Sequence, residues 1–376
     1  MKKLTDICDI QYGYAFDSKC FTEDSSYPQL VRIRDVKKGY SETYYSGDYP
    51  EEYILSEGDL LVGMDGEFNI ARWKCSGALL NQRVCRLTAK VGTNEEYLRF
   101  AMSKSLKEIE QRTAFVTVKH LSAKELNKLE LDVPELSKQD KIADTLSRLE
   151  RVIEARKEEM EKLDDLIKAR FVEMFGDIAT GNYKYDTRKL GDVANVGSSH
   201  RVFTTEFVKK GIPFYRGTEI GELANGNKPA EPFYISEEHY NRLVYNDTKP
   251  QVGDLLLPSI CNKGQVWMVD TDEPFYYKDG RVLCISPDRE IFDTKYLECF
   301  MKAKTLVEYP KLGSGSTFAE FKIFLLKNID VLIPPRELQE QFSMFVKQVD
   351  KSKVAVQKAL DETQLLFDSL MQQYFE

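Results

Sequence analysis

The chain has 376 residues, of which 42% are hydrophobic and 30% charged, and a formal net charge of −8 at pH 7. This is an ordinary globular composition, long enough for two domains with separate cores. The seven cysteines include no C-x-x-C pair, no apolar segment follows Met1, and the longest apolar runs are too short to span a bilayer. We therefore expect a cytoplasmic protein without disulfides, bound metal or membrane contact.

Acidic and basic side chains are evenly distributed. Residues 1–134, 135–176, 177–335 and 336–376 each carry two more acidic than basic residues. No block has the basic excess typical of a nucleic-acid-binding domain. Any binding of DNA would therefore depend on local clusters, or on a partner that neutralises phosphate charge.

The first 134 residues predict a small domain of short strands with a few helices. An extended segment is expected from Pro28 to Val36, and the predicted turn Gly58-Asp59 precedes the apolar run Leu60–Val62. An amphipathic helix is expected from Glu95 to Gln111. Short strands beside one or two helices are typical of an α+β domain.

The stretch 135–176 differs, because its apolar residues recur at steps of three and four. This period of 3.5 residues, held for about five heptads, predicts a long helix that pairs through a narrow stripe. Ser137 with Asp140 predicts the start of the helix, and Gly176 its end. The polar segment 177–188 predicts a linker. The seam residues that we expect to pack on a partner helix are Leu146, Leu149, Ile153 and Leu163.

The rest of the chain repeats this order. Arg32 in the first extended segment returns as Arg216, and at an interval of 200 residues Gln139 returns as Gln339. The second heptad stretch keeps the same phase. Its expected seam residues are Val349, Val356, Leu360 and Phe367. The chain is thus predicted to be a tandem repeat whose four parts are a domain at 1–134, a helix at 135–176, a domain at 177–335 and a helix at 336–376.

Each apolar stripe needs a partner, and the second domain lies between the two helices in sequence. We therefore expect the helices to pair in antiparallel orientation as a coiled coil, with the domains at opposite ends. The alternative is two unrelated surface helices, each docked on its own domain.

Catalytic motifs are missing from the sequence. It contains no G-x-x-x-x-G-K-[ST] phosphate loop and no G-x-G-x-x-G opening a helix. The three histidines, His120, His200 and His239, have no nucleophile arrangement around them. The carboxylates are scattered, so no acid and base can be paired. We expect no catalytic residue in this chain.

Recognition chemistry remains, because basic and polar residues form local clusters. Arg, Lys and Gln can bind base edges in the major groove, and Ser and Thr suit phosphate oxygens. The alternative for each residue is a solvated surface position. The candidates for DNA binding are Arg32, Arg72, Lys74, Arg83, Thr117, Lys119 and His120 in the first half, and Arg216, Lys263, Gln265, Lys278, Arg281, Ser316 and Thr317 in the second.

The doubled order of these features resembles the specificity (S) subunit of type I restriction-modification systems, over nearly the whole chain. The shared features are Pro-x₃-Arg or Pro-x₂-Arg, Gly-Asp-Leu-Leu, Gln-Arg-Val or Gly-Arg-Val, a Gly-Ser-Thr type loop, and Pro with a following Gln before each long helix. Two departures are visible. The first half has Arg112 to Thr117 in place of the Gly-Ser-Thr type loop, and the second half has extra residues between Ile220 and Gly253, which predict an added recognition loop.

The resemblance implies an α+β protein with two tandem target-recognition domains, each of which reads one half of a split, asymmetric DNA site. The paired helices would space the domains and dock two modification (methyltransferase) subunits, and restriction/translocase subunits would join them. S-adenosylmethionine, Mg²⁺ and ATP would belong to those partners, with no cofactor in this chain. Two alternatives are a scaffold of two binding domains that does not bind DNA, and a silent, shuffled copy of such a specificity gene.

Overall fold

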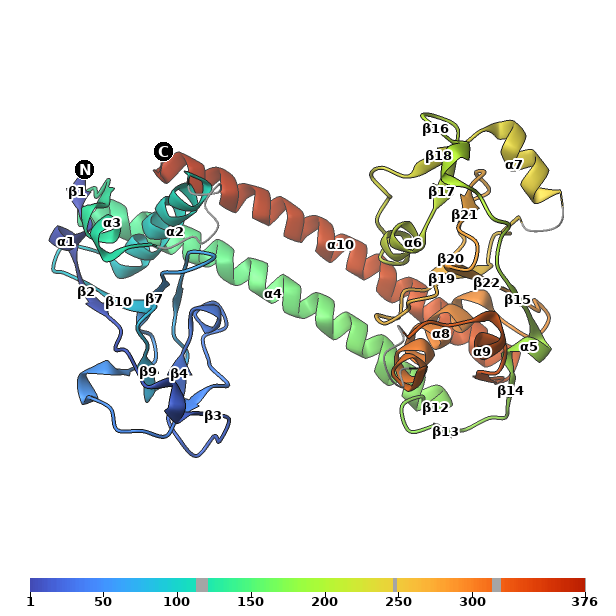
Figure 1. Ribbon diagram of the computed structural model, residues 1–376, viewed down its shortest axis with the longest axis horizontal. Helices are drawn as coiled ribbons and strands as arrows, with labels where there is room; N and C mark the ends of the chain where they lie inside the picture. Colours follow the sequence, from blue (N-terminus) through green and yellow to red (C-terminus); the bar gives the residue numbers. More distant parts are fainter. Residues whose placement is uncertain (113–120, 246–248, 313–318, 376) are drawn as a thin grey trace. The chain divides into compact units, whose positions relative to one another are not determined.

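The computed structural model describes residues 1–112, 121–245, 249–312 and 319–375. Its contacts divide the chain into two compact units (Figure 1). Unit 1 comprises Met1–Glu158 with Val356–Glu376, and unit 2 comprises Glu159–Ala355. In the described part of the chain, no helix is both long and apolar enough to cross a membrane.

The core of unit 1 is an antiparallel sheet of four strands. Its order is β2 (Cys8–Tyr12), β10 (Val84–Ala89), β7 (Leu60–Gly63) and β8 (Asn69–Arg72). A smaller sheet places β4 (Leu30–Val31) parallel to β9 (Ala78–Leu80), whose other neighbour is the antiparallel β6 (Ile54–Leu55). All four residues of β7 are buried, because this strand has neighbours on both sides.

Unit 2 repeats this arrangement. Its main sheet has the order β15 (Ala194–Gly197), β22 (Val282–Pro287), β19 (Leu255–Pro258) and β20 (Trp267–Met268). Again two short strands run parallel, β17 (Ile212–Tyr215) and β21 (Tyr276–Tyr277). The order and directions of the main-sheet strands agree, and so does the parallel pair, so the predicted tandem repeat is confirmed.

The remaining elements surround these sheets. In unit 1 they are β1 (Lys2–Lys3), α1 (Leu4–Ile7), η1 (Ser18–Cys20), β3 (Phe21–Thr22), η2 (Ile33–Asp35), β5 (Tyr44–Tyr45), η3 (Glu51–Tyr53), α2 (Glu95–Arg112), α3 (Ala123–Lys128) and β11 (Glu130–Leu131). In unit 2 they are β12 (Gly176–Asp177), β13 (Asn182–Tyr183), β14 (Thr187–Lys189), α5 (Leu190–Val193), η4 (Thr204–Glu206), β16 (Phe207–Val208), α6 (Gly217–Ala224), β18 (Phe233–Ile235), α7 (Glu237–Val244), α8 (Thr294–Glu308), η5 (Tyr309–Leu312), α9 (Ile323–Lys327) and β23 (Asp330–Leu332).

The second repeat contains α7 and β18 within the extra segment noted between Ile220 and Gly253.

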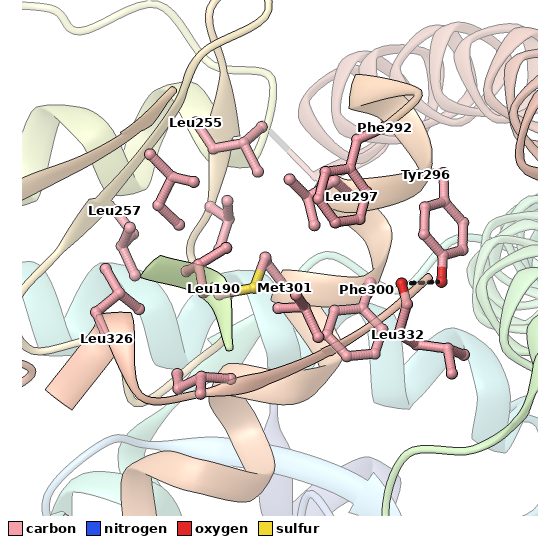
Figure 2. Close-up of a cluster of buried hydrophobic side chains, with 14 of the residues drawn as sticks. Leu190, Leu255, Leu257, Phe292, Tyr296, Leu297, Phe300, Met301, Leu326 and Leu332 are labelled. Carbon is pink, nitrogen blue, oxygen red and sulfur yellow. Dashed lines mark hydrogen bonds between the residues drawn. The ribbon is translucent and has the colours of Figure 1, made fainter. Parts of the chain in front are cut away.

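In unit 2 the core lies between the main sheet, α8 and α9, where leucine and aromatic side chains pack against one another (Figure 2). The Tyr296 hydroxyl on α8 donates to the carbonyl of Leu332 at 3.2 Å. In unit 1, Tyr97 donates to the carbonyl of Asp132 at 2.8 Å. A buried hydroxyl therefore has a partner in both repeats.

The two matched glutamines make the same contacts at the start of each long helix. The Gln139 side chain accepts from the backbone of Asn94 at 2.9 Å and donates to the carbonyl of Pro134 at 2.7 Å. Gln339 accepts from the backbone of Asp293 at 2.9 Å and donates to the carbonyl of Pro334 at 2.8 Å. Both side chains are almost fully buried, so each fixes a long helix to the domain that precedes it.

The long helices are α4 (Leu136–Phe175) and α10 (Arg336–Phe375). In unit 1 the first part of α4, with Leu146, shares a core with the last part of α10, which includes Phe367. In unit 2 the last part of α4 contacts the first part of α10, where the rings of Phe171 and Phe342 are 5.5 Å apart. Opposite ends meet in both units. The helices are therefore antiparallel, and the predicted fold class is confirmed.

The predicted seam residues face inward to different degrees. Leu146, Ile153 and Val349 are buried, and Leu149, Leu163, Val356, Leu360 and Phe367 are half-buried. Polar contacts accompany them. Arg156 donates to the carbonyl of Ala359 and to the hydroxyl of Thr363, and in unit 2 the Lys353 ammonium lies 2.7 Å from the Asp164 carboxylate.

Two local expectations need correction. Helix α4 begins at Leu136, so Ser137 lies inside the helix, and its hydroxyl donates to the Glu135 carboxylate at 2.9 Å. The segment 177–188 is more than a linker, because β12 and β13 pair within it and Ile178 is buried in the core of unit 2. Gly176 has a φ of +99°, which a glycine adopts without strain, and it ends the helix as predicted.

An ion-pair network joins α2 to α4 in unit 1. The Arg99 guanidinium donates to Glu96 at 2.7 Å and to Glu150 at 3.1 Å, and Arg72 pairs with the same Glu96. Burial alone would raise the pKa of the Glu96 carboxyl, but Arg99 and Arg72 outweigh it and hold this pKa below its ordinary value of 4.5.

We expect Arg99→Met to lower the free energy of unfolding by about 2 kcal/mol at pH 7, because charge-assisted hydrogen bonds are lost. A lowered pKa stabilises the fold above the unfolded value, and this contribution disappears as the pH falls through the folded value. The difference between wild type and variant in urea unfolding should therefore shrink below pH 4.5. Arg112→Met on the same helix, whose side chain is 79% exposed, is the matched control. Equal effects of the two substitutions would contradict the network.

Candidate nucleic-acid interface

The carboxyl ends of the parallel strands bring candidate residues together in both units. Arg32 directly follows β4, and Arg216 directly follows β17. Lys278 follows β21, the parallel neighbour of β17, and its N–H donates to the carbonyl of Tyr215 at 2.9 Å. Parallel strands end at the same edge of a sheet, so Arg216 and Lys278 lie at one edge.

Arg83 and Arg281 come next to this edge, just before β10 and β22. The carbonyl of Arg83 accepts from the backbone of Met64 at 3.0 Å, and that of Arg281 from Ser259 at 2.9 Å.

A third segment joins the same edge in each unit. The backbone N–H of Leu121 donates to the carbonyl of Met64 at 2.7 Å, and the backbone N–H of Phe321 donates to the carbonyl of Ser259 at 2.7 Å. Matching hydrogen bonds therefore join three segments in each unit, and the segment that follows β4 or β17 is the fourth at this edge. We call these positions the duplicated edge; it consists of residues 32–35, 64–68, 81–83 and 121 in unit 1, and 216–219, 259–266, 278–281 and 321 in unit 2.

Arg83 and Arg281 of the duplicated edge are each held by an acid but remain accessible. Arg83 Nε lies 3.3 Å from Asp65, and its side chain is 51% exposed. Arg281 Nη1 donates to Glu320 at 2.6 Å, and its side chain is 57% exposed. An anchored guanidinium with an exposed face can bind a base edge or a phosphate at little cost in side-chain entropy.

Arg216 is fixed more firmly. Its guanidinium donates to Glu219 through Nε at 3.1 Å and Nη2 at 2.6 Å, and lies 4.5 Å from the centre of the Phe233 ring. Burial would raise the pKa of the Glu219 carboxyl, but the hydrogen bonds from Arg216 lower it. Glu219 therefore stays ionised beside the arginine.

Arg32 occupies the same place without this support. Asp35 is one methylene shorter than Glu219, and its carboxylate accepts from the backbone of Arg32 at 3.1 Å and from the hydroxyl of Ser41 at 2.9 Å. The exposed Arg32 side chain lines a groove of about 890 Å³ together with Arg34 and Lys38. The groove is also lined by the carboxylates of Glu23, Asp35 and Glu42, so cations and anions balance in it.

Lys263 and Gln265 lie in the loop between β19 and β20. The Gln265 side-chain oxygen accepts from the backbone of Lys263 at 3.2 Å, which closes the loop on itself. Gly264 has a φ of +67°, and a side chain there would meet the carbonyl of Lys302 at 2.7 Å. Lys263 and Lys278 are exposed, and Gln265 is half-buried.

The structure does not bring Arg72 and Lys74 to the duplicated edge. In β8, Arg72 pairs with Leu60, at the far end of the hairpin from residues 64–68. Its guanidinium donates to the carbonyl of Gly58 at 2.6 Å and lies 3.5 Å from Glu95. Lys74 is exposed beyond that end of the strand. Gly58, with a φ of +92°, forms the expected turn.

Five predicted contact residues lie outside the described residues: Thr117, Lys119, His120, Ser316 and Thr317. Conversely, no sequence pattern indicates Asp65, Glu320 or Phe233 as supports of the arginines. Only Glu219 had a signal, because Arg-x-x-Asp at 32–35 returns as Arg-x-x-Glu at 216–219.

Comparison with known proteins identifies the class. The family described as "Type I restriction modification DNA specificity domain" matches residues 1–164 and 182–363, which is one match to each repeat. The chain belongs to this family, and its role is therefore in DNA sequence specificity rather than in catalysis. The match does not favour a scaffold that ignores DNA, or a silent copy, over this role.

Individual relatives agree. The chain is 27% identical to the type I restriction enzyme EcoBI specificity subunit of Escherichia coli, over 99% of this chain and 84% of that protein. It is 23% identical to the MjaIX specificity subunit of Methanocaldococcus jannaschii, over 77% of this chain and 70% of that protein.

Two solved structures share the fold. One is the S subunit of a type I restriction-modification system from M. genitalium, with a TM-score of 0.58, 15% identity and coverage of 100% of this chain and 95% of that one. The other is a structure described as the basis of complex assembly and conformational transition of the type I R-M system. It has a TM-score of 0.55 and 17% identity, over 99% of this chain and 96% of that one.

Proposed function

We propose that the chain reads a split, asymmetric DNA site, with one half-site bound by each repeat. The observation that carries this proposal is the duplicated edge, where Arg83 and Arg281 occupy equivalent places next to loops of unlike sequence. Equivalent scaffolds with unlike side chains would bind two half-sites of unlike sequence. The whole site would then lack the symmetry of a palindrome.

We further propose that the chain recruits two modification (methyltransferase) subunits and the restriction/translocase subunits of a type I system in the cytoplasm. S-adenosylmethionine, Mg²⁺ and ATP would be bound by those partners. The net charge of −8 supports a division of labour in which partner subunits neutralise much of the phosphate charge.

The test is selection of bound sequences from random double-stranded DNA by the full chain together with its modification subunit. Two short sequences separated by a fixed unread gap are the expected result. Enrichment of one sequence, or of none, would contradict the proposal.

We expect Arg281→Ala to weaken binding by about 1–3 kcal/mol and to relax specificity at one position of one half-site, because Arg binds guanine O6 and N7. The measurement is the same selection, followed by titration of the enriched DNA. Lys189→Ala, on β14 in the separate two-stranded sheet with β23, is the control. Equal weakening for all sequences would instead identify Arg281 as a phosphate contact.

A further inference from the structure

The loop that opens the duplicated edge has opposite charge in the two repeats. In unit 1, residues 64–68 between β7 and β8 contain Asp65 and Glu67 and no basic residue. In unit 2, residues 259–266 between β19 and β20 contain Lys263 and no acidic residue, and the loop is longer. The backbone at the start of the loop is nevertheless the same in both units. Met64 and Ser259 each donate a hydrogen bond to the carbonyl of the edge arginine and accept one from the segment at 121 or 321.

The charged side chains of the two loops also differ in the ion pairs that they make. In unit 1 both acids hold cations of the surrounding surface: Asp65 lies 3.3 Å from Arg83, and Glu67 pairs with Lys37. In unit 2 the acid that holds Arg281 is Glu320, which lies outside the loop. The loop of unit 2 therefore supplies no acid to Arg281, and it carries an exposed ammonium at Lys263.

Arg83 and Arg281 occur at the same place in both repeats, so a contact made by them is available to both half-sites. It cannot by itself make the half-sites differ. The two loops can make the half-sites differ, because their side chains form different hydrogen bonds with bases. A carboxylate accepts from base amino groups, whereas an ammonium donates to guanine O6 and N7 and an amide NH₂ donates to adenine N7.

Resting on the proposed function, we propose that loops 64–68 and 259–266 set the difference between the two half-sites, with Lys263 and Gln265 as base-reading residues of repeat 2. The half-site of repeat 2 then contains a purine whose acceptors are read by this loop. The half-site of repeat 1 has no such contact at the equivalent position.

The test uses the full chain with its modification subunit and selection from random double-stranded DNA. Lys263→Ala is expected to reduce discrimination about tenfold at one position of one half-site, with the other half-site unchanged. Gln265→Glu keeps the oxygen that accepts from the backbone of Lys263 but removes the NH₂ donor, so it preserves the loop while changing the base read. Its expected effect is a changed preference at a neighbouring position of the same half-site.

Lys189→Ala again serves as the control, since it removes the same charge from β14, which pairs with β23 outside the main sheet. A wild-type chain that selects two half-sites, with both variants selecting the same two sequences unchanged, would overturn the inference and leave the proposed function standing. Loss of discrimination in both half-sites at once would also overturn it. If the wild type selects no split site, the proposed function itself fails, and the inference with it.

Discussion

Phe342→Ala is expected to lower the free energy of unfolding by about 3–5 kcal/mol, the usual cost of removing a buried aromatic side chain. Phe342 on α10 is fully buried, and its ring lies 5.5 Å from those of both Phe171 and Phe175 on α4. The substitution removes the side chain through which the two helices share one core, and α4 and α10 should loosen together. The measurement is urea unfolding followed by far-ultraviolet circular dichroism.

Met344→Ala, two residues along the same helix, is the control because that side chain is 63% exposed. Its expected effect is within about 0.5 kcal/mol. The pairing in unit 2 would be contradicted if Phe342→Ala cost no more than Met344→Ala.

Insertion of one heptad into both long helices is expected to lengthen the unread gap between the half-sites by about three base pairs. Helices α4 and α10 both pass from one unit to the other, between Glu158 and Glu159 and between Ala355 and Val356. Seven residues add about 10 Å to a helix and keep the phase of the seam, and one base pair rises about 3.4 Å. The recognised half-sites themselves should not change. The gap can be read from the methylated sites of a strain that carries the variant and its modification subunit.

The matched control is the same heptad inserted into α4 alone. This insertion displaces the apolar stripe of α4 by about 10 Å against that of α10. The variant should therefore have a lower free energy of unfolding rather than a longer gap between the half-sites. An unchanged gap in the stable double insertion would show that the helices do not set the distance between the half-sites.

The long helices and the doubled fold could be predicted because their signals are local or repetitive. A 3.5-residue period is visible within the stretch itself, and the order of domain and helix in the second half follows from its likeness to the first half. The start of α4 was misplaced, because a local Ser137–Asp140 signal is weaker than the helix-forming residues around it. The contacts of Gln139 and Gln339 became visible only in the structure, although their shared position was plain in the sequence.

The supports of the candidate site could not be predicted, because they join residues that are distant in sequence. Glu320 lies 39 residues from Arg281, and no pattern in either segment indicates the pair. Arg72 is predicted as a DNA contact from its basic cluster, and no pattern in the sequence indicates that its guanidinium also pairs with Glu95, Glu96 and the carbonyl of Gly58. Whether a cation holds the fold or faces a ligand depends on tertiary partners.

The closure of unit 1 by the end of α10 has a consequence for biosynthesis. Phe367, Leu370, Tyr374 and Phe375 pack on the core formed by residues near the N-terminus, so the Tyr97 ring lies 5.3 Å from that of Phe375. The ribosome makes these partners last among the described residues. The domain that is synthesised first therefore keeps apolar surface exposed until α10 has been made, whereas unit 2, which is continuous in sequence, can close earlier. We therefore expect unit 2 to be able to fold before unit 1 is complete, and the nascent first domain to be the part that is exposed longest to aggregation.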